Sequence, residues 1–266
     1  MALFDNLFGG EKNAHEAVAA ARANGRNTTM DFISNIFHGF IEMRGDRRFG
    51  DDKAIVSGLA WLADIPVTVI GHEKGHNVKE RSQRNYGSPH PEGYRKALRQ
   101  MKLAEKFHRP VVCFVDTAGA YCGVGAEERG QGQAIAESIS EMISLRTPVI
   151  SILIGEGGSG GALALAAGDE VWMLENAIYS VISPEGCASI LWKDPSRVKE
   201  ASERLRLTAK DMLNLGVIER IVSEGSSMFE DLKRVLAETL SHKLTLDINE
   251  LVESRYNRFR RMGYTS

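Results

Sequence analysis

The chain has 266 residues, a formal net charge of −2 and 43% hydrophobic residues, which is enough for one large domain or two small ones with a sizeable core. The near-neutral charge excludes a general attraction for nucleic acid. No apolar run reaches the ~18 residues of a membrane span, and the N-terminus lacks a signal-peptide pattern, so we expect neither a membrane nor a nucleic-acid partner.

The first third of the chain predicts helices on either side of a hairpin. Residues 1–29 are polar and alanine-rich, which predicts an N-terminal arm or a short helix. Helix-capping residues then precede a stripe of apolar side chains at helical spacing: Phe32, Ile33, Ile36, Phe37 and Phe40. Residues 54–62 and 66–71 read as two strands joined by a turn at Asp64, and residues 93–107 as an amphipathic helix.

Two strand–helix units follow. Residues 110–116 predict a buried strand followed by a long helix over residues 127–144, and residues 147–154 predict a second strand followed by a helix over residues 162–167. Near-continuous apolar strands separated by helices are typical of an α/β fold whose sheet is buried on both faces. Strand onsets at Pro66, Pro110 and Pro148 suggest a winding superhelix of repeated strand–helix units.

Two short strands, residues 170–174 and 177–182, lead to a third helix signal. Ser183 at the cap position and Pro184 in the first turn predict that a helix begins there.

The loop between the second strand and its helix has five glycines in seven residues, Gly155 to Gly161. Glycine allows a ligand to approach backbone N–H groups without a Cβ in the way, and a helix start adds N–H donors that lack partners. The loop therefore predicts a site for an anion or for an oxyanion that develops during a reaction.

Several interpretations of this loop compete. A phosphate-binding P-loop requires a Lys after the glycines, and none follows. Gly157 to Gly161 matches Gly-x-Ser-x-Gly, which would make Ser159 the nucleophile of a serine hydrolase or ClpP-like peptidase, but only His242 follows as a base. A backbone oxyanion hole without a nucleophile, close strand–helix packing alone, and a non-enzymatic scaffold subunit remain the alternatives.

Charged and polar residues elsewhere give weaker signals. A local basic cluster could attract the phosphates of coenzyme A or an acidic partner, or could simply be solvated: Lys74, Lys79, Arg81, Arg84, Arg95, Lys96 and Arg99. The residues from Asp116 to Gly123 follow a strand and could form a substrate wall or only a turn. Arg129 near a helix start could pair with a carboxylate or contact substrate.

The three cysteines, Cys113, Cys122 and Cys187, contain no Cys-x-x-Cys pair and favour a reducing cytoplasm. His72 and His76 have no carboxylate or cysteine at metal-ligand spacing. We therefore expect no metal in this chain.

Long motifs in the right order make the chain resemble one family, the alpha subunits of bacterial acetyl-CoA carboxylase carboxyltransferase. The motifs are Gly45-Asp-Arg, Asp51-Asp-Lys-Ala-Ile-Val56, Gly71-His-x-Lys74, Pro91-Glu-Gly-Tyr-Arg-Lys-Ala-Leu-Arg99, Asp116-Thr-x-Gly-Ala-Tyr121, Gly123-Val-Gly-Ala-Glu-Glu-Arg-Gly-Gln131, Gly155-Glu-Gly-Gly-Ser-Gly-Gly-Ala-Leu-Ala164 and Tyr179-Ser-Val-Ile-Ser-Pro-Glu-Gly-Cys-Ala-Ser-Ile-Leu-Trp192. The resemblance implies a crotonase/ClpP-like α/β superhelix with flanking helices, over a domain of residues 30–245 followed by a C-terminal helical segment, residues 246–266.

The resemblance also implies an activity. With a beta subunit, expected as an alpha2beta2 complex, the family moves CO2 from carboxybiotin on the biotin carboxyl carrier protein to acetyl-CoA. The product, malonyl-CoA, begins fatty acid biosynthesis. Biotin carboxylase is a further expected partner, and biotin is not bound covalently to this chain.

Site residues are implied by position. The beta subunit is expected to hold the acetyl-CoA enolate, and the alpha subunit the ureido oxygen of biotin. The matching catalytic positions are Gly160 and Gly161, through their backbone N–H groups. Gly157, Gly158, Gly119 and Arg129 are expected to contact substrate. Ser159 then has no nucleophilic role.

Overall fold

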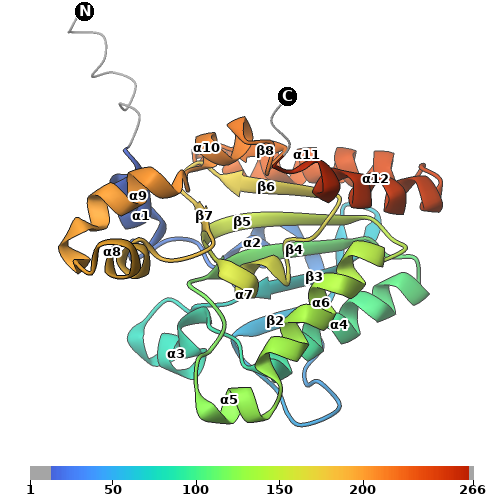
Figure 1. Cartoon of the computed structure of the whole chain (residues 1–266). Helices are drawn as coiled ribbons and strands as arrows, with labels where there is room; N and C mark the ends of the chain where they lie inside the picture. The colour runs from blue at the N-terminus through green and yellow to red at the C-terminus, as the bar shows by residue number, and fades with distance from the viewer. Residues whose placement is uncertain (1–12, 264–266) are drawn as a thin grey trace, which may run out of the picture.

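A mixed β-sheet runs through the middle of the molecule, with helices on both faces (Figure 1). The computed structural model describes residues 13–263. The strands are β1 His38–Glu42, β2 Ile55–Leu62, β3 Ile65–His72, β4 Val111–Thr117, β5 Val149–Gly158, β6 Glu170–Leu174, β7 Ile178–Ser180 and β8 Arg220–Val222. Their order across the sheet is β1-β2-β3-β4-β5-β6-β8, and β7 pairs with the end of β5.

The α-helices are α1 Ala14–Ala21, α2 Thr29–Ile36, α3 Val78–Gln83, α4 Pro91–Lys106, α5 Val124–Glu128, α6 Gln131–Ser144, α7 Ser159–Leu163, α8 Pro184–Trp192, α9 Val198–Leu205, α10 Ala209–Asn214, α11 Met228–Lys243 and α12 Ile248–Arg261. Short 3-10 turns, η1 Asn85–Gly87 and η2 Pro195–Arg197, connect some of them. Within residues 13–263, no helix is both long enough and apolar enough to span a bilayer.

The sheet changes from antiparallel to parallel pairing at β3. The predicted hairpin is confirmed as β2 and β3, which pair antiparallel from Leu62 opposite Ile65 to Ile55 opposite His72. From β3 onward, the neighbours β4, β5, β6 and β8 are parallel. Every residue of β4 is buried, as expected for a strand that is covered on both faces.

Helices α4 and α6 lie on one face of the sheet, and α2 packs on the other (Figure 1). Aromatic rings join α2 to the sheet and to α11: the ring centroids of Phe32 and Phe114 are 5.2 Å apart, and those of Phe32 and Phe229 are also 5.2 Å apart. These contacts sit within one continuous apolar core that extends from α2 to α11.

The N-terminal helix α1 has a small core of its own. Ala17, Val18 and Ala21 pack against Ile178 of β7 and Leu207. This packing places the C-terminal end of α1 beside the end of β5, which is the region of the glycine loop.

Three predicted elements differ from those observed. The helix that begins near Thr29 ends at Ile36, and Phe40 lies in strand β1 rather than on the helix, because the β-sheet edge beside β2 provides pairing partners. The predicted helix over residues 127–144 is broken at Gly130, whose φ of 82° belongs to the left-handed region. The helix predicted at residues 162–167 begins earlier, at Ser159, and also ends earlier, at Leu163.

Candidate active site

The glycine loop lies at the edge of the sheet where the parallel strands end. Strands β3, β4 and β5 run in the same direction, so their carboxyl ends and the residues that follow them meet at this edge. Strand β5 ends at Gly158, and helix α7 begins at the next residue. This edge is where open α/β sheets usually bind ligands.

Several glycines of the loop are required by close backbone contacts. A Cβ on Gly158 would lie 2.1 Å from the carbonyl oxygen of Ala118, and one on Gly161 would lie 2.6 Å from the nitrogen of Ala120. A Cβ on Gly160, by contrast, would have an ordinary contact of 3.5 Å with Ile135. The absence of a side chain at Gly160 is therefore not imposed by packing.

The first turn of α7 contains backbone N–H groups without helical partners. Ser159, Gly160 and Gly161 have no helical carbonyl four residues earlier to which they could donate. The carbonyl of Gly160 accepts from the nitrogen of Ala164 at 3.0 Å, which fixes the plane of the peptide that carries the Gly161 N–H. Such fixed donors suit an oxyanion.

Two cavities adjoin the loop. One, of about 400 Å³, is mainly apolar and is lined by Ser159, Gly160, Leu163, Tyr179, Ser180, Val181, Leu205, Met212 and Val217. The other, of about 280 Å³, includes Gly157 and Gly158 together with Arg22 and Glu156 in its walls. Burial raises the pKa of Tyr179 to about 12, so its phenol remains protonated at neutral pH.

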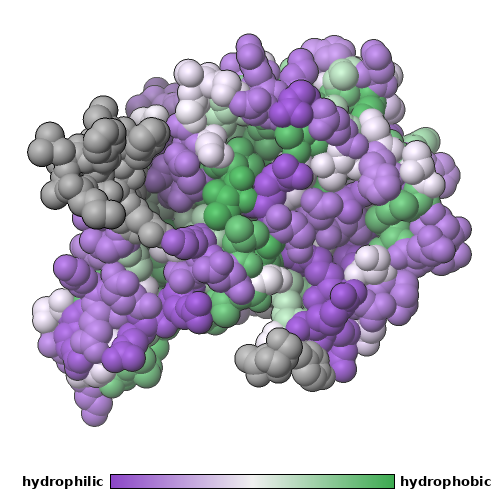
Figure 2. Space-filling view, turned by 90° about the horizontal axis from the view of Figure 1, so that it is seen from above, coloured by the Kyte–Doolittle hydropathy of each residue, from purple (hydrophilic) through white to green (hydrophobic). Residues whose placement is uncertain are grey.

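Apolar surface continues over the neighbouring helices. Figure 2 shows a band of hydrophobic surface that crosses the face seen from above, with hydrophilic surface on both sides. Helix α10 lies at the top of the molecule in Figure 1. Leu213 of α10 and Leu215, which follows it, are exposed apolar residues.

Strand β5 bulges where the glycine loop begins. Val115 pairs with Leu153 and Thr117 pairs with Gly157, so three residues of β5 lie opposite Asp116 alone. The backbone groups of the bulge bind side chains instead: Asp116 Oδ1 accepts the N–H of Glu156 at 2.8 Å, and Arg26 donates to the carbonyl of Ile154 at 2.7 Å. A bulge of this kind redirects the end of a strand.

A group of ion pairs surrounds the bulge. Lys74 Nζ lies 2.7 Å from Asp116 Oδ1 and 2.8 Å from Glu156 Oε2, and Arg22 Nε lies 2.7 Å from Glu156 Oε1. Burial alone would lower the pKa of Lys74, but the two carboxylates outweigh it and raise that pKa. Burial would raise the pKa of Glu156, and Lys74 and Arg22 lower it instead. Lys74 and Glu156 are therefore both charged at neutral pH.

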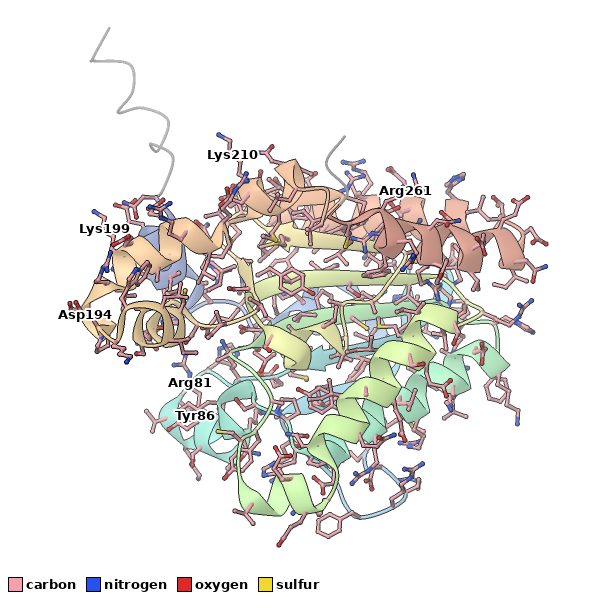
Figure 3. The ribbon with its side chains drawn as sticks, in the orientation of Figure 1. Arg81, Tyr86, Asp194, Lys199, Lys210 and Arg261 are labelled. Carbon is pink, nitrogen blue, oxygen red and sulfur yellow. The ribbon has the colours of Figure 1, made fainter. Side chains whose placement is uncertain are left out.

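The ion pairs border a third cavity, of about 220 Å³. Arg81 and Tyr86, which Figure 3 shows on the α3 side below α8, also line it. Of the predicted basic cluster, Lys74 and Arg81 thus reach this cavity, whereas Lys96 is buried and pairs with Asp51 at 2.7 Å. The residues of the predicted basic cluster therefore lie in separate environments.

Buried polar side chains lie beneath α7. Both ring nitrogens of His72 and the hydroxyl of Tyr94 make no hydrogen bond of normal geometry, and a Cβ on Gly161 would lie 2.8 Å from that hydroxyl. Burial, reinforced by the charge of Lys74, lowers the pKa of His72 to about 3. His72 is therefore a neutral residue that packs below the loop.

The surroundings of Ser159 do not complete a catalytic triad. Ser159 has a φ of 52°, a strained backbone conformation for a non-glycine residue. Within residues 13–263, no histidine hydrogen-bonds to its hydroxyl. His242 is exposed, and the next residue, Lys243, pairs with Glu170 at 2.9 Å. Glu170 is the first residue of β6, so His242 lies near the amino ends of the parallel strands, whereas the glycine loop lies at their carboxyl ends.

The other expected substrate-contact residues divide into two groups. Gly119 meets the glycine loop, because a Cβ on Gly161 would lie 3.0 Å from its carbonyl carbon. Arg129 instead forms an ion pair with Glu92 and stacks on Phe49, with 4.6 Å from its guanidinium carbon to the ring centroid. Arg129 does not line the two cavities at the loop.

Sequence reasoning placed Lys74 only in a broad basic cluster, and it did not identify Glu156 or Arg22 as parts of the site. Two acids carried a detectable signal: Glu156 lies inside a glycine run at a strand end, and Asp116 ends an otherwise apolar predicted strand. Acids at such buried positions require cationic partners. Arg22, distant in sequence, gave no such signal.

Within residues 13–263, no group of three or more His, Cys, Asp or Glu side chains is arranged to hold a metal ion. The candidate site therefore consists of backbone donors, apolar walls and the ion pairs behind them.

The chain is similar to known proteins over almost its whole length. The family model described as acetyl co-enzyme A carboxylase carboxyltransferase-like matches residues 5–263. The chain is 60% identical over 255 residues to the acetyl-coenzyme A carboxylase carboxyl transferase subunit alpha of Ruminiclostridium cellulolyticum, which covers 94% of this chain and 98% of that protein.

A longer relative and a solved structure extend the comparison. A Natranaerobius thermophilus protein named acetyl-coenzyme A carboxylase carboxyl transferase subunits beta/alpha is 53% identical over 257 residues, which cover 94% of this chain and 42% of that protein. The transcarboxylase 12S structure aligns with a TM-score of 0.73 at 17% identity, over 88% of this chain and 44% of that one. This likeness concerns the fold alone, and it confirms the expected crotonase-like architecture.

Proposed function

The chain belongs to the family of acetyl-CoA carboxylase carboxyltransferase alpha subunits, and from this premise we propose that its glycine loop binds the ureido oxygen of biotin through the N–H groups of Gly160 and Gly161. The single observation that carries the proposal is the geometry of α7. Its first-turn N–H groups lack helical partners, and Gly160 borders the largest of the cavities described above.

We infer that the substrate is carboxybiotin on the biotin carboxyl carrier protein and that the acceptor is acetyl-CoA. The beta/alpha protein of Natranaerobius thermophilus supports a beta subunit as the direct partner, because it combines both subunit names in one chain. An alpha2beta2 complex, biotin carboxylase as a further component, and a cytoplasmic location complete the proposal.

The site fits the proposed group. Its donor set consists of backbone N–H groups, which suit a neutral carbonyl-type oxygen that becomes negative, and the adjoining cavity is mainly apolar, which suits a ring system with few polar atoms. When bound, carboxybiotin supplies the carboxyl group that is transferred. The contribution of this chain is to orient the ring and to stabilise developing charge on its oxygen.

The magnitude of this contribution follows from the fixed positions of the donors. Removal of one well-aligned oxyanion donor typically costs ~3 kcal/mol of transition-state stabilisation. The Gly160 carbonyl is held by Ala164, so the donor on Gly161 needs no reorganisation during the reaction. No side-chain nucleophile is required in this chain.

The comparisons give no support to the alternative of a serine hydrolase or ClpP-like peptidase, and the position of His242 argues against it. Ser159 occupies a tight turn between β5 and α7. We propose that its role is conformational. Gly157 and Gly158 line the neighbouring cavity of about 280 Å³ rather than the one proposed for the ring. Their assignment to substrate binding, like those of Gly119 and Arg129, stays a prediction.

The test removes one N–H donor while it keeps the loop conformation. In the complex with a beta subunit, we would measure malonyl-CoA-dependent carboxylation of biocytin for Ser159→Gly, which frees the backbone at φ of 52°, and for Ser159→Gly combined with Gly160→Pro. We expect the proline to lower kcat by about 100- to 1,000-fold relative to Ser159→Gly alone.

Gly160→Ala is the matched control. It keeps the N–H, and its Cβ has an ordinary contact of 3.5 Å with Ile135, so we expect its kcat to fall far less than that of the proline variant. Assembly of each variant with the beta subunit would be checked by size-exclusion chromatography. Full activity of the assembled proline variant, or stoichiometric labelling of Ser159 by a fluorophosphonate, would overturn the proposal.

A further inference from the structure

The β5 bulge is held by side chains from three different parts of the chain. Its Glu156 N–H donates to Asp116, its Ile154 carbonyl accepts from Arg26, and its Glu156 carboxylate accepts from Lys74. In a regular parallel ladder these backbone groups would pair with a neighbouring strand. Here the side chains replace that pairing.

Lys74 is the centre of this arrangement. Its Nζ lies within 2.8 Å of carboxylates from two adjacent strand ends, Asp116 of β4 and Glu156 of β5. Its side chain is 18% exposed, and each carboxylate side chain is 11% exposed. Two acids that meet in a poorly solvated place repel each other unless a cation lies between them.

The bulge is directly connected to the proposed donors. Glu156 is followed by Gly157 and Gly158, which pair with Tyr179 and Ser180 of β7 and not with β6. The bulge therefore turns the end of β5 away from β6 and toward β7, and it sets the direction in which α7 begins. Any shift at Glu156 is transmitted through two residues to Ser159.

We propose that Lys74, together with Asp116 and Glu156, acts as a positioning cluster that holds the β5 bulge and thereby orients the N–H groups of Gly160 and Gly161 for carboxyl transfer. The inference rests on the proposed function of those N–H groups. None of the three side chains needs to touch the reacting atoms. Arg22, which directly follows α1, extends the cluster, and through Glu185 at 2.7 Å it also connects to α8.

The cluster requires a cation between its two carboxylates. Without Lys74, Asp116 and Glu156 would face each other, and among residues 13–263 Arg22 would be the only cation in contact with either carboxylate. The Glu156 N–H would keep Asp116 as its acceptor, but repulsion would separate the two strand ends. A misplacement of about 1 Å at a reacting centre can cost about 100-fold in rate.

The principal test is Lys74→Met in the complex with a beta subunit. We expect kcat for malonyl-CoA-dependent carboxylation of biocytin to fall by about 10- to 100-fold. KM for malonyl-CoA should stay within about twofold, because the lost interaction acts on loop geometry rather than on binding of the coenzyme A substrate. Lys102→Met is the matched control, since Lys102 pairs with Glu141 at 3.0 Å on exposed surface, and its kcat should be unchanged.

A second readout does not depend on activity. Hydrogen–deuterium exchange of the amides of residues 153–161 should be about tenfold faster or more in Lys74→Met than in wild type and Lys102→Met, measured without substrate. A fall in kcat with unchanged exchange would overturn the inference, because Lys74 would then act directly on a substrate. Wild-type kcat would also overturn it.

Two further variants keep the test decisive. Glu156→Gln preserves shape and removes one charge, and should lower kcat less than Lys74→Met does; a rate equal to wild type contradicts the inference even if Lys74→Met fails to assemble. In the double variant that combines Lys74→Met with Glu156→Gln, the fall in kcat should be smaller than the product of the two single falls, because both residues act through one interaction.

The experiments distinguish failure of this inference from failure of the proposed function. If the Gly160→Pro variant remains fully active while Lys74→Met loosens the loop, the oxyanion assignment is wrong and the positioning of the bulge is supported. If the Gly160→Pro variant is inactive and Lys74→Met exchanges like wild type, the oxyanion assignment stands and the positioning cluster is wrong.

Discussion

At the scale of single residues, Asp46 shows how one carboxylate fixes a loop. Its Oδ1 accepts the N–H groups of Arg48, Phe49 and Gly50 at 2.8–3.0 Å, and its Oδ2 accepts from Arg95 Nε at 2.8 Å. Burial would raise the pKa of Asp46, but these donors outweigh it and lower that pKa to about 2. The ionised form is thus strongly preferred in the folded protein.

Asp46→Asn should therefore reduce stability in a pH-dependent way. A carboxyl whose folded pKa is depressed stabilises the fold above its unfolded pKa of ~3.9, and that stabilisation is lost as pH falls toward the folded value. We expect Asp46→Asn to cost about 1–2 kcal/mol at pH 7, after allowance for solvent screening, and clearly less at pH 3. Urea unfolding at both pH values would measure this difference, and an equal cost at the two pH values would contradict it.

At the scale of elements, two Gly→Ala substitutions should change the free energy of unfolding in opposite directions. Helix α2 packs so closely on β3 that a Cβ on Gly71 would lie 2.5 Å from the side chain of Thr29. Gly132 lies on the exposed side of α6, with no atom within 4 Å of its would-be Cβ.

We expect Gly71→Ala to lower the free energy of unfolding by about 1–3 kcal/mol, because the helix must move away from the sheet. Gly132→Ala should raise it by about 0.5–1 kcal/mol, since alanine is the better helix former. Urea denaturation of the two variants gives the comparison. A higher free energy of unfolding for Gly71→Ala would contradict this expectation, because it would show that α2 can move away from β3 at little cost.

The elements also show what the sequence could and could not predict. Apolar runs located β4, β5 and the β2–β3 hairpin, and Ser183 with Pro184 located the start of α8, because these signals are local. Phe40 was wrongly placed on a helix, because its strand depends on pairing with β2. The glycine loop was visible as a motif, and the expected family is shown by the comparisons.

The bulge before that loop could not be predicted. It follows from the register between β4 and β5, and register is a property of two strands rather than of either sequence. For the same reason Lys74, Asp116 and Glu156 looked like unrelated charges in three separate segments. Only parallel strands that end together bring them into contact.

At the scale of the whole molecule, Arg255 closes the C-terminal end of the fold. Its side chain is fully buried and pairs with Asp169, with Nε 2.8 Å from Oδ1. It also donates to the carbonyls of Met142, Leu145 and Thr147 at 2.7–2.9 Å. One side chain of α12 thereby joins the end of α6, the approach to β5 and the turn before β6.

Arg255→Met should lower the free energy of unfolding by about 3–5 kcal/mol, because Asp169 would remain buried without its cation. Adding Asp169→Asn should recover part of this loss, since the amide oxygen can still accept the N–H of Val149. Arg234→Met, which removes exposed ion pairs on α11, serves as the control and should change stability by less than about 1 kcal/mol. Equal costs at Arg255 and Arg234 would refute the assignment of Arg255 as an anchor.

The ion pairs of Arg22 have a consequence for synthesis of the protein. Arg22 contacts Glu156 and Glu185, which are 134 and 163 residues later in the chain. On the ribosome, α1 therefore emerges long before either partner exists. Both ion pairs of Arg22 can form only after the chain has been synthesised through Glu185, so the contacts that join α1 to the proposed site are among the later ones available to the growing chain.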